Sequence, residues 1–591
     1  MCGLGGAFSK RETRKDVSEI LLRENFIKHL RYRGPDNLGS WFDEDYSSGA
    51  IHARLSVVDL TTRSDQPYRS KCGRYVVLFN GEIYNFEELA TNIHLHGDKC
   101  SGFSEVEIIT SLYKLHGAAA FSMLQGMFAI VIFDLRFERL TLARDEFGIK
   151  PLFYTVNDDV VFFSSLIKPL IESRSGDVST NDAAAFSYYL LGFIVEPLTL
   201  FQEIFTVEPG SVLTFDKNFV SSITEFSYQS NVHLPNQANT PIAIVGAAIR
   251  YVVAKQSRAD VPVALALSGG IDSAIIASCM SEHLQPRERF AITLVFEGQC
   301  GTDNYEAEAA IATAKKFGFK HKIVSYSQED LERCFVQYLR SIDQPSFDGF
   351  NIWLVSKVAR EEGFKVLLSG IGADELFNSY TILKSNFVWL NLISYLPRWM
   401  RHSLILMMRA SFALRKVFGG QQPPKLAWLE QVSGSTVEIY MYLRALNSRS
   451  QATALAESDS WFVLKATIQE FLKNIEIKPT KKSIESVLRV LDTKTYLRSQ
   501  LLRVGDCSSM ANGVEVRVPF VDQYLYEQLT DHGHMLKIDK WELARLEFDV
   551  PRMVVQRRKT GFVVPKGPIR KSSLEEIVFV FENFLATLRK K

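Results

Sequence analysis

The chain has few of the features that mark secreted, membrane-spanning or nucleic-acid-binding proteins. Its seven cysteines are an odd number scattered over 591 residues, which argues against a disulfide framework and favours a reducing compartment. The formal net charge is only +1, so the charge balance gives no reason to expect a nucleic-acid partner. The start of the chain lacks the basic and apolar regions of a signal peptide. We therefore expect a cytoplasmic protein.

Long uninterrupted hydrophobic runs are also lacking. The most membrane-like region, residues 387–418, contains one proline and four arginines, so it cannot cross a bilayer at low cost. The interrupting residues are Pro397, Arg398, Arg401, Arg409 and Arg415. We predict no membrane span and a pair of packed amphipathic helices in this region. A patch that binds a membrane surface is the alternative interpretation.

The length and the local patterns predict two domains. A chain of 591 residues exceeds what one hydrophobic core usually covers. Residues 1–215 contain mainly short strand-like segments. Residues 241–591 alternate helices with apolar strands, which predicts an α/β parallel sheet with helices on its faces and extra helices beyond it. Residues 216–240 are the predicted linker, because 228–240 is polar and contains proline and several asparagines.

The expected elements can be assigned to residue ranges. In the first domain the candidate strands are 74–79, 127–134, 139–143, 160–163 and 211–215, with helices near 17–30 and 106–115. In the second domain the candidate strands are 261–267, 291–296 and 365–368, and a helix begins at 303 and ends near 318. These ranges place the motifs that follow on strands, turns or helices.

A glycine-rich segment, residues 268–273 with the sequence SGGIDS, follows the strand expected at 261–267. Asp272 and Ser273 are candidates to cap the helix that should come next. A strand that turns through glycines into a helix exposes backbone N–H groups at a positive dipole end, and this geometry binds phosphate. Asp272 would repel a bare anion, so it makes chemical sense beside a Mg²⁺ ion that bridges carboxylate and phosphate. A purely structural Gly-Gly turn is the alternative.

A second glycine-rich turn follows the strand expected at 365–368. Residues 369–377 read SGIGADELF and place Asp374 after the glycines. Ligands of open α/β sheets bind at the carboxyl ends of the strands. We therefore expect Asp374 and Asp272 to face the same triphosphate and to share Mg²⁺. The alternative is that Asp374 only caps a helix.

Cys2 lies where a structural cysteine would be poorly placed, because chain ends are usually exposed. If Met1 is removed, Cys2 carries both a thiol and a free α-amine. The α-amine has a reference pKa of about 7.7–8.0, so it can act as the general base for the thiol of the same residue. This is the arrangement of an N-terminal nucleophile.

Later segments supply groups that such a nucleophile needs. Residues 31–36 read RYRGPD, residues 52–56 read HARLS and residues 79–85 read FNGEIYN. Asn80-Gly81 follows a strand and is expected to form a turn, and the Asn amide beside the Gly N–H makes a candidate oxyanion hole. Arg54 can pair bidentately with the carboxylate of an amino acid.

The order of these motifs resembles the glutaminase domain of class II glutamine amidotransferases. Residues 142–154, LARDEFGIKPLFY, extend the resemblance to the asparagine synthetase branch. The resemblance implies an αββα sandwich of the Ntn-hydrolase type, in which Cys2 attacks the amide of glutamine. The implied residues are catalytic Cys2, Asn80 and Gly81 and glutamine-binding Arg54, Glu82 and Glu105.

Glu105 departs from this family pattern. The family has Ser-Asp-x-Glu where residues 104–107 read SEVE, and the family's aspartate grips the α-amino group of glutamine. Glu105 keeps the charge but adds a methylene. We expect glutamine binding to survive, weakened at most. The alternative is an inactive glutaminase domain that is fed by free ammonia.

The second half resembles the synthetase domain of the same family, which belongs to the ATP pyrophosphatases of the adenine nucleotide α-hydrolase or PP-loop type. Residues 506–511, DCSSMA, and 515–522, EVRVPFVD, extend this resemblance, although they also fit a buried structural network. In residues 557–565, RRKTGFVVP, the family's lysine is Lys559, which neutralises charge on the phosphates in the transition state. The implied ATP-binding residues are Leu267, Ser268, Gly269, Gly270, Asp272, Ser273, Val295, Ser369 and Gly370, and the implied Mg²⁺ ligands are Asp272 and Asp374.

The resemblance implies a reaction in two stages. A substrate carboxylate attacks the α-phosphorus of Mg·ATP and gives an acyl-adenylate and pyrophosphate. Ammonia released from glutamine at Cys2 then travels inside the protein and attacks the adenylate. The expected small-molecule partners are glutamine, ATP and a carboxylate acceptor, by default aspartate, and a homodimer is left open.

Ile371 makes the acceptor uncertain at the level of sequence. The asparagine-forming members carry Glu at this position, whereas an isoleucine can neither take a proton nor pair with a cation. The alternative is the same chemistry on another carboxylate: a sugar uronic acid in surface-polysaccharide assembly, or ring closure of a peptide or β-amino acid. A non-catalytic regulatory protein is a further alternative, against which the intact Cys2, residues 268–273 and Lys559 argue.

Overall fold

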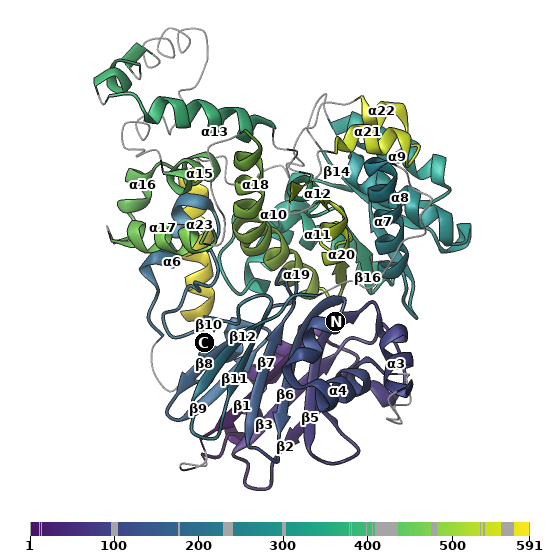
Figure 1. Cartoon of the computed structure of the whole chain (residues 1–591), viewed down its shortest axis with the longest axis vertical. Coiled ribbons are helices and arrows are strands. Elements are labelled where there is room, and N and C mark those ends of the chain that lie inside the picture. The colour runs from purple at the N-terminus through teal and green to yellow at the C-terminus, as the bar shows by residue number, and fades with distance from the viewer. Residues whose placement is uncertain are drawn as a thin grey trace.

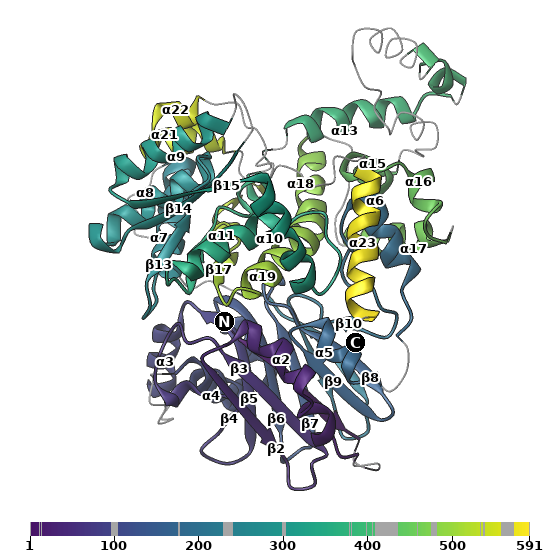
Figure 2. The same ribbon diagram turned by 180° about the vertical axis from the view of Figure 1, so that it is seen from behind.

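The computed structural model shows a β-rich half and a mainly helical half (Figure 1). It describes residues 2–10, 12, 15–95, 104–174, 178–228, 240–297, 303–377, 379, 381–397, 399–404, 406–407, 435–457, 459–473, 481–531, 534–535, 538–556 and 573–589. The view from behind shows the same two halves, with both marked chain ends near the junction between them (Figure 2). Functional residues from the start of the chain can therefore meet residues of the helical half.

Two antiparallel sheets stack in the β-rich half. The first has the order β10-β8-β9-β1-β3-β2, and the second has the order β12-β11-β7-β6-β5-β4. The strands are β1 (Gly3–Ser9), β2 (Asn37–Phe42), β3 (Ser48–Arg54), β4 (Tyr68–Arg69), β5 (Tyr75–Ile83), β6 (Gly126–Asp134), β7 (Arg139–Arg144), β8 (Phe153–Asn157), β9 (Val160–Ser164), β10 (Phe205–Thr206), β11 (Ser211–Phe215) and β12 (Ser221–Glu225).

The central strands are apolar on both faces because each sheet is covered on one face by the other sheet and on the opposite face by helices. Along β5, Val76 and Leu78 belong to the core between the sheets, whereas Val77 and Phe79 belong to the core under the outer helices. Side chains of a strand alternate between its two faces. A strand with both faces buried therefore reads as a continuous hydrophobic run, as residues 75–79 do (YVVLF).

Helices cover the outer faces of the two sheets and complete four α/β/β/α layers. On the first sheet lie α1 (Ser18–Leu21), α2 (Glu24–Arg33) and α5 (Ile167–Glu172); on the second lie α3 (Phe86–Leu95) and α4 (Glu105–His116). The helix expected near 17–30 is thus two helices, since the chain leaves the helical conformation at Arg23. β12 pairs with β11, so the second sheet continues past residue 215, into the range predicted to be a linker.

One segment of the β-rich half crosses into the helical half. α6 (Asp182–Leu191) packs against three helices of the other half: α16 (Arg449–Thr453), α17 (Ser460–Glu470) and α23 (Ser573–Arg589). Leu446 N–H donates to Leu190 O at 2.8 Å, and the Tyr188 hydroxyl donates to Ile577 O at 3.2 Å. The two halves are therefore joined by packed and hydrogen-bonded elements as well as by the connecting chain.

The helical half contains the predicted parallel sheet. Its order is β15-β14-β13-β16-β17, and all four strand pairs are parallel. The strands are β13 (Val263–Ala266), β14 (Phe290–Phe296), β15 (Lys320–Tyr326), β16 (Val366–Leu368) and β17 (Glu515–Arg517); a separate hairpin is β18 (Thr530–Asp531) with β19 (His534–Met535). The three strands expected from the sequence are confirmed, with ends shifted by one or two residues.

Helices lie on both faces of this sheet. The remaining helices are α7 (Pro241–Gln256), α8 (Ile271–His283), α9 (Asp303–Phe317), α10 (Gln328–Ser341), α11 (Phe350–Glu361), α12 (Ala373–Leu376), α13 (Thr381–Ser394), α15 (Thr436–Arg444), α18 (Lys481–Asp492), a π-helical segment Thr493–Leu502, α19 (Arg503–Met510), α20 (Gln523–Gln528), α21 (Lys540–Leu546) and α22 (Arg552–Val555). Val263 and Leu265 of β13 pack with α7 and α8, whereas Ala264 packs in the core that contains α11. The continuous apolar character of β13 follows from this double burial.

The strand order of the parallel sheet reverses between β13 and β16. In chain order the five strands read 3-2-1-4-5 across the sheet. Open α/β sheets bind ligands beside the carboxyl ends of the strands at such a reversal. The two glycine-rich turns singled out in the sequence follow β13 and β16, so both lie at this point.

The predicted caps of α8 are wrong. α8 begins at Ile271, and Gly270 occupies the N-cap position without a side-chain cap. Asp272 and Ser273 therefore fall within the first turn. The extended backbone of Gly270 (φ −84°, ψ 164°) leads directly into the helix, so capping by a side chain is not what starts it.

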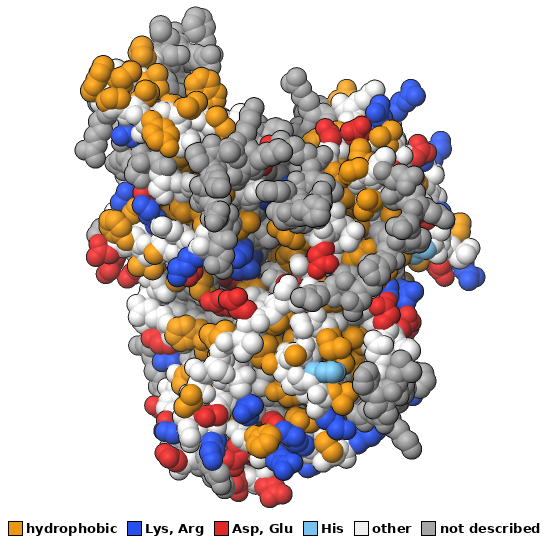
Figure 3. Space-filling view, in the orientation of Figure 1, with side chains coloured by type: hydrophobic (Ala, Val, Ile, Leu, Met, Phe, Trp, Pro, Cys, Tyr) orange, Lys and Arg blue, Asp and Glu red, His pale blue; other side chains and the backbone are white. Residues whose placement is uncertain are grey.

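α13 protrudes from the helical half at the end far from the two stacked sheets (Figures 1 and 2). Phe387 and Leu390 on its inner face are buried, in agreement with the predicted packing. Its outer face exposes Trp389 and Leu392, and hydrophobic side chains gather there in the space-filling view (Figure 3). The rest of the predicted helix pair lies partly outside the described residues. Over the described ranges, no helix combines the length and apolarity needed to cross a membrane.

Candidate active sites

Cys2 lies directly before β1 and is held from two sides. β1 pairs with β3 so that Leu4 lies opposite His52. The Cys2 backbone N–H donates to Asn80 Oδ1 at 2.9 Å, and the Cys2 carbonyl accepts from Arg33 Nε at 3.0 Å. Asn80 belongs to β5 of the second sheet and Arg33 to the end of α2. Elements of three layers therefore fix the position of the candidate nucleophile.

The Cys2 thiol is chemically suited to be a nucleophile. Burial raises its pKa, but the charges of His52 and of the chain's amino terminus, with hydrogen bonds from the His52 ring and the Leu55 backbone, together outweigh burial and lower the pKa to about 6. His52 is fully buried, with Nε2 3.2 Å from Phe79 O. A thiol with a lowered pKa is largely thiolate at neutral pH, and the thiolate is the reactive form.

Asn80 and Gly81 lie beside Cys2 inside β5. The predicted turn at this pair is wrong, because β5 continues to Ile83 and Asn80 pairs with Ala129 of β6. Asn80 is fully buried, and its Nδ2 has no hydrogen-bond partner among the described residues. A Cβ at Gly81 would come within 2.0 Å of Met127 O, so the approach of β6 requires glycine. A buried, unpaired N–H donor next to a thiolate is the kind of group that holds an oxyanion.

A small pocket, partly open to solvent, adjoins Cys2. It is lined by five of the residues that the sequence singled out: Cys2, Arg54, Gly81, Glu82 and Glu105. The Arg54 guanidinium is fixed by Asp65 Oδ1 at 2.9 Å and by the carbonyl groups of Thr61, at 2.8 Å, and Asp59. The fold therefore brings together a cysteine, an arginine and two carboxyl groups that are far apart in the first domain's sequence.

Glu82 and Glu105 place two carboxyl groups close together in this pocket. Burial raises the pKa of Glu82 to about 7, against the lowering effect of Arg517. Burial and the neighbouring Glu82 raise the pKa of Glu105 well above its usual value, although Glu105 Oε1 accepts from Ile83 N–H at 2.6 Å. Two neighbouring carboxyls resist double ionisation. A cationic group entering the pocket would relieve this repulsion.

The first glycine-rich turn is shaped by close packing. Gly269 has φ +74°, and a Cβ there would lie 2.3 Å from Glu306 O of α9. Ser273 Oγ donates to Gly270 O at 3.1 Å and accepts from Ser268 N–H at 3.3 Å. The serine thereby ties the turn to the first helical turn of α8. Backbone N–H groups at the start of α8 lie at its positive dipole end, the geometry expected for phosphate.

The second glycine-rich turn packs directly on the first. A Cβ added at Gly370 would lie 3.0 Å from Asp272 Cβ. Lys540, the first residue of α21, joins the two turns: its Nζ lies 2.8 Å from Asp272 Oδ1 and 2.6 Å from Asp374 Oδ1. Only 2% of the Lys540 side chain is exposed. The two predicted carboxylates therefore meet at one point, and a positive charge lies between them.

Leu267 and Val295 lie at the carboxyl edge of the parallel sheet, next to these turns. Leu267 is buried, its N–H donates to Ile292 O at 2.9 Å, and its carbonyl accepts from Thr293 Oγ1 at 2.6 Å. Val295 is half-buried near the end of β14. The candidate catalytic Lys559 lies outside the described residues.

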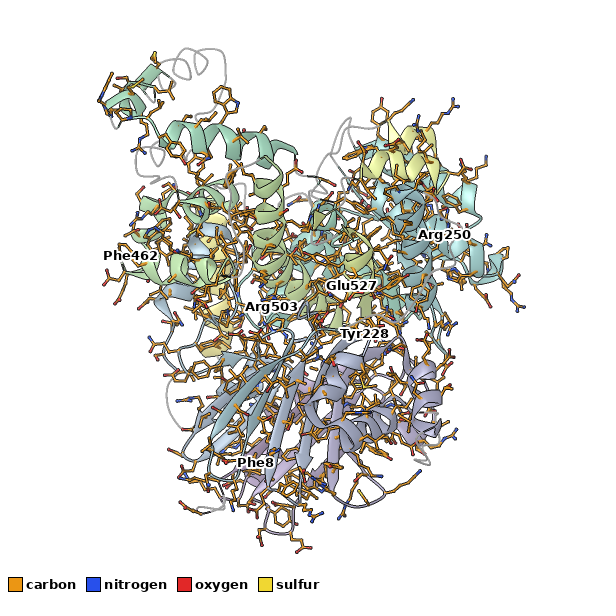
Figure 4. The ribbon with its side chains drawn as sticks, viewed as in Figure 1. Phe8, Tyr228, Arg250, Phe462, Arg503 and Glu527 are labelled. Carbon is orange, nitrogen blue, oxygen red and sulfur yellow. The ribbon has the colours of Figure 1, made fainter. Side chains whose placement is uncertain are left out.

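Arg33 links the candidate nucleophile to the helical half. Its Nη1 lies 2.7 Å from Asp506 Oδ2 of α19, while its Nε donates to the Cys2 carbonyl. Arg503, also of α19, lies at the junction (Figure 4), with its guanidinium carbon 4.6 Å from the centre of the Phe153 ring of β8. The Asp506 and Arg517 motifs are buried structural networks, as their alternative interpretation predicted, and these networks cross the junction.

The sequence did not indicate that His52 lies beside Cys2 or that Lys540 lies between Asp272 and Asp374. His52 stood within a quoted motif, but nothing local indicated that it would lie beside Cys2. Lys540 carried no motif at all and is separated from Asp272 by 268 positions. A lysine one residue after a helix-capping Asp539 is locally unremarkable. Only the packing of α21 on α8 brings it to the two aspartates.

Comparison with known proteins assigns both parts of the chain to families. Residues 1–227 match the glutamine amidotransferase domain family and residues 245–579 match the asparagine synthase family. The chain is 29% identical over 596 residues to asparagine synthetase [glutamine-hydrolyzing] 1 of Bacillus subtilis (98% of this chain, 89% of that protein). It is 25% identical over 587 residues to asparagine synthetase [glutamine-hydrolyzing] 3 of the same organism (95% and 87%). It is 26% identical over 561 residues to the amidase chry2 of Gibberella zeae (89% and 80%). The chain belongs to the asparagine synthase family and carries a glutamine amidotransferase domain ahead of its synthase domain.

Proposed function

We propose that the protein converts aspartate to asparagine with glutamine as the nitrogen donor and ATP as the activating substrate. Its family makes it an ATP-dependent, glutamine-hydrolysing ligase. The observation that carries the proposal is the placement of Arg517, which borders both sites. Its guanidinium lies 3.0 Å from Glu82 of the Cys2 pocket, and its carbonyl accepts from Ser369 N–H of the second glycine-rich turn.

The first domain, residues 1–215 in our division, releases ammonia from glutamine. After removal of Met1, the Cys2 thiolate attacks the amide carbonyl, and the Cys2 α-amine takes up the proton that the thiol releases. Asn80 Nδ2 and Gly81 N–H stabilise the oxyanion. Ammonia leaves, and water hydrolyses the thioester to glutamate. Arg54 pairs with the glutamine carboxylate, and Glu82 and Glu105 pair with its α-ammonium group.

The second domain, residues 241–591 after the linker 216–240, activates the acceptor. The turn at 268–270, the start of α8 and the second-turn residues Ser369 and Gly370 bind the phosphates of ATP, and Ser273 shapes the first turn. Leu267 and Val295 border the nucleotide base. The acceptor carboxylate attacks the α-phosphorus, and pyrophosphate leaves. Lys559 offsets the charge that builds on the phosphates. Ammonia then displaces AMP from the acyl-adenylate.

Mg²⁺ is the proposed metal, with Asp272 and Asp374 as its protein ligands. The donor set fits, because Mg²⁺ prefers oxygen ligands and is usually held by one or two carboxylates together with substrate phosphates. The Lys540 ammonium between the two carboxylates marks a point where this chain stabilises positive charge. When bound, the ion would neutralise part of the triphosphate charge.

Aspartate is the default acceptor, and Ile371 is the reason to test it directly. Ile371 is half-buried and packs on the hydrophobic core of the helical half, so it offers the acceptor an apolar contact and no charge. The second candidate is the same reaction on another carboxylate such as a sugar uronic acid. Both candidates use the same nucleotide and glutamine chemistry.

Pyrophosphate release from Mg·ATP and glutamine distinguishes these candidates. We expect release that depends on aspartate, with one asparagine and one AMP formed for each pyrophosphate. Glutamine hydrolysis without aspartate-dependent pyrophosphate would overturn the choice of acceptor but keep the reaction type, and sugar acids and peptides should then be assayed. Absence of pyrophosphate with every acceptor would overturn the proposed synthetase function.

A further inference from the structure

α13 has two apolar faces, of which the fold uses only one. Phe387 and Leu390 are 3% and 8% exposed and pack toward α15 and α18. On the opposite face Trp389 is 66% exposed and Leu392 is 58% exposed. A surface helix needs one apolar stripe to hold it on the protein, and its other face is normally polar. Contacts among the described residues therefore do not account for the apolar outer face of α13.

The exposed apolar surface continues beyond α13. Backbone helix resumes at 399–404 and 406–407. We call the following set the arm patch: Trp389, Leu392, Tyr395, Trp399, Met400, Leu406 and Met407, with exposures of 66%, 58%, 79%, 70%, 38%, 48% and 63%. The patch covers the protruding part of the helical half (Figure 3). Contiguous apolar surface of this kind marks a site of interaction.

The stretch of sequence that contains the arm patch carries charge of one sign. Residues 376–429 contain no Asp or Glu and seven basic residues: Lys384, Arg398, Arg401, Arg409, Arg415, Lys416 and Lys425. The chain as a whole is nearly neutral, with 68 basic and 67 acidic residues. The segment that carries the exposed apolar surface is therefore the segment from which acidic residues are missing. A segment of this charge is attracted to anionic lipid headgroups.

The residue types of the arm patch suit a membrane interface better than a protein partner. Tryptophan and tyrosine favour the interfacial layer, where their rings are half apolar and half hydrated. Three of the seven tryptophans of the chain, Trp389, Trp399 and Trp428, lie in residues 376–429. α13 has 14 residues, too few to span a bilayer that needs about 20. An apolar and basic segment of this length lies in the plane of the interface.

We propose that the arm patch docks the protein on the surface of an anionic lipid bilayer. The patch lies at the end of the molecule opposite the two stacked sheets (Figures 1 and 2). Docking would turn the helical half toward the lipid and the Cys2 domain toward the aqueous phase. α12, which carries Asp374, lies between α13 and the two stacked sheets (Figure 1), so of the two candidate sites the nucleotide site would be the nearer to the membrane.

Vesicle flotation of the full-length protein tests this proposal. The probes are vesicles of phosphatidylcholine alone and of an equal mixture of phosphatidylcholine and phosphatidylglycerol. We expect binding to the mixed vesicles, weaker binding to the neutral ones, and loss of the difference at high salt. The variant W389S/Y395S/W399S should reduce partitioning to mixed vesicles about a hundredfold, because it removes three interfacial rings.

The control variant is Phe462→Ser. Phe462 is 62% exposed on α17 of the same half but lies outside the arm patch (Figure 4), so this variant should bind vesicles as the wild type does. Unchanged glutamine hydrolysis shows that each variant is folded. Failure of the wild type to bind mixed vesicles would overturn the proposal, and so would undiminished binding of the triple variant. Light scattering that shows a wild-type dimer, dissociated by the triple substitution, would assign the patch to a second copy instead.

Discussion

Arg517 and Glu82 form a buried ion pair across the junction of the two halves, with Arg517 Nη2 3.0 Å from Glu82 Oε2. Glu82 lines the Cys2 pocket, and the carbonyl of Arg517 accepts from Ser369 N–H at 2.9 Å. Glu515 Oε1 lies 2.5 Å from Arg517 Nε, so the guanidinium is shared by two carboxylates. A single buried residue thereby connects the Cys2 pocket to the second glycine-rich turn.

Substitution of Arg517 should affect both stability and glutamine use. In Arg517→Met, Glu82 and Glu515 lose their common partner in a fully buried position, and we expect a loss of about 3–5 kcal/mol in the free energy of unfolding. The KM for glutamine should rise. Thermal unfolding and glutaminase kinetics measure these effects. Arg333→Met is the control. Arg333 pairs with Asp330 on the surface, and surface ion pairs contribute little to the free energy of unfolding. Equal stability of the two variants would contradict a stabilising role for the buried Arg517 guanidinium.

Cys2→Ala should abolish glutamine-dependent synthesis and leave ammonia-dependent synthesis intact, because the nucleophile and the nucleotide turns lie in separate sites. The assay compares product formed from glutamine with product formed from ammonium chloride. Cys279→Ala is the control. Burial raises the pKa of the Cys279 thiol, so that thiol should neither react with iodoacetamide at neutral pH nor matter for glutamine. Loss of both activities in folded Cys2→Ala would contradict the two-site division.

Glutamine binding should strengthen as the pH rises through about 7. Burial raises the pKa of Glu82 to about 7, so below this pH the carboxyl is protonated and cannot pair with the α-ammonium group. Above it the carboxylate is ionised, and binding of the cation is favoured. Below the pKa the affinity should fall by up to about tenfold per pH unit. Calorimetry on Cys2→Ala isolates this effect from titration of the thiol.

Glu82→Gln provides the comparison for the pH dependence. It cannot titrate, so its glutamine affinity should be lower at pH 8 and should change less between pH 6 and 8. A pH profile identical to that of Cys2→Ala alone would assign the titration to another group.

Lys540→Met should impair the nucleotide reaction selectively. Lys540 Nζ is the positive charge that Asp272 and Asp374 share, and its removal leaves two carboxylates facing each other. We expect pyrophosphate formation to fall about 10²–10³-fold, while glutamine hydrolysis is retained. Lys465→Met is the control. Lys465 Nζ lies 2.6 Å from Glu438 Oε1, and this pair is remote from both candidate sites. Normal pyrophosphate formation in Lys540→Met would refute a role for this lysine.

Gly269→Ala should disrupt the first nucleotide turn through a clash with α9. The added Cβ would lie 2.3 Å from Glu306 O, and the residue has φ +74°. Gly363→Ala is the control: it has φ +88°, but a Cβ there meets nothing within 4 Å. Both variants should carry a backbone strain of about 1–2 kcal/mol. Only Gly269→Ala should lose ATP-dependent activity, and equal activity of the two would show that the clash is irrelevant.

The sequence by itself determined the local features of this protein. The continuous apolar runs predicted the buried strands, and β11 has the bounds expected for it. The alternation of strands and helices predicted the parallel sheet. The glycines next to carboxylates identified both turns that meet at the carboxyl edge of this sheet. Such patterns depend on backbone conformation and side-chain periodicity over a few residues, so they can be read without the fold.

Only the tertiary structure decided which distant charges meet. Lys540 reaches Asp272 and Asp374 because α21 packs on α8, and Arg517 reaches Glu82 because β17 lies at the junction. The strand β5 runs through Asn80-Gly81, where local turn statistics predicted a turn, because pairing with β6 stabilises the extended conformation. The exposed face of α13 was likewise invisible in the sequence, since an apolar residue looks the same whether neighbouring helices cover it or leave it bare. Long-range packing sets these contacts, and packing is a property of the whole chain.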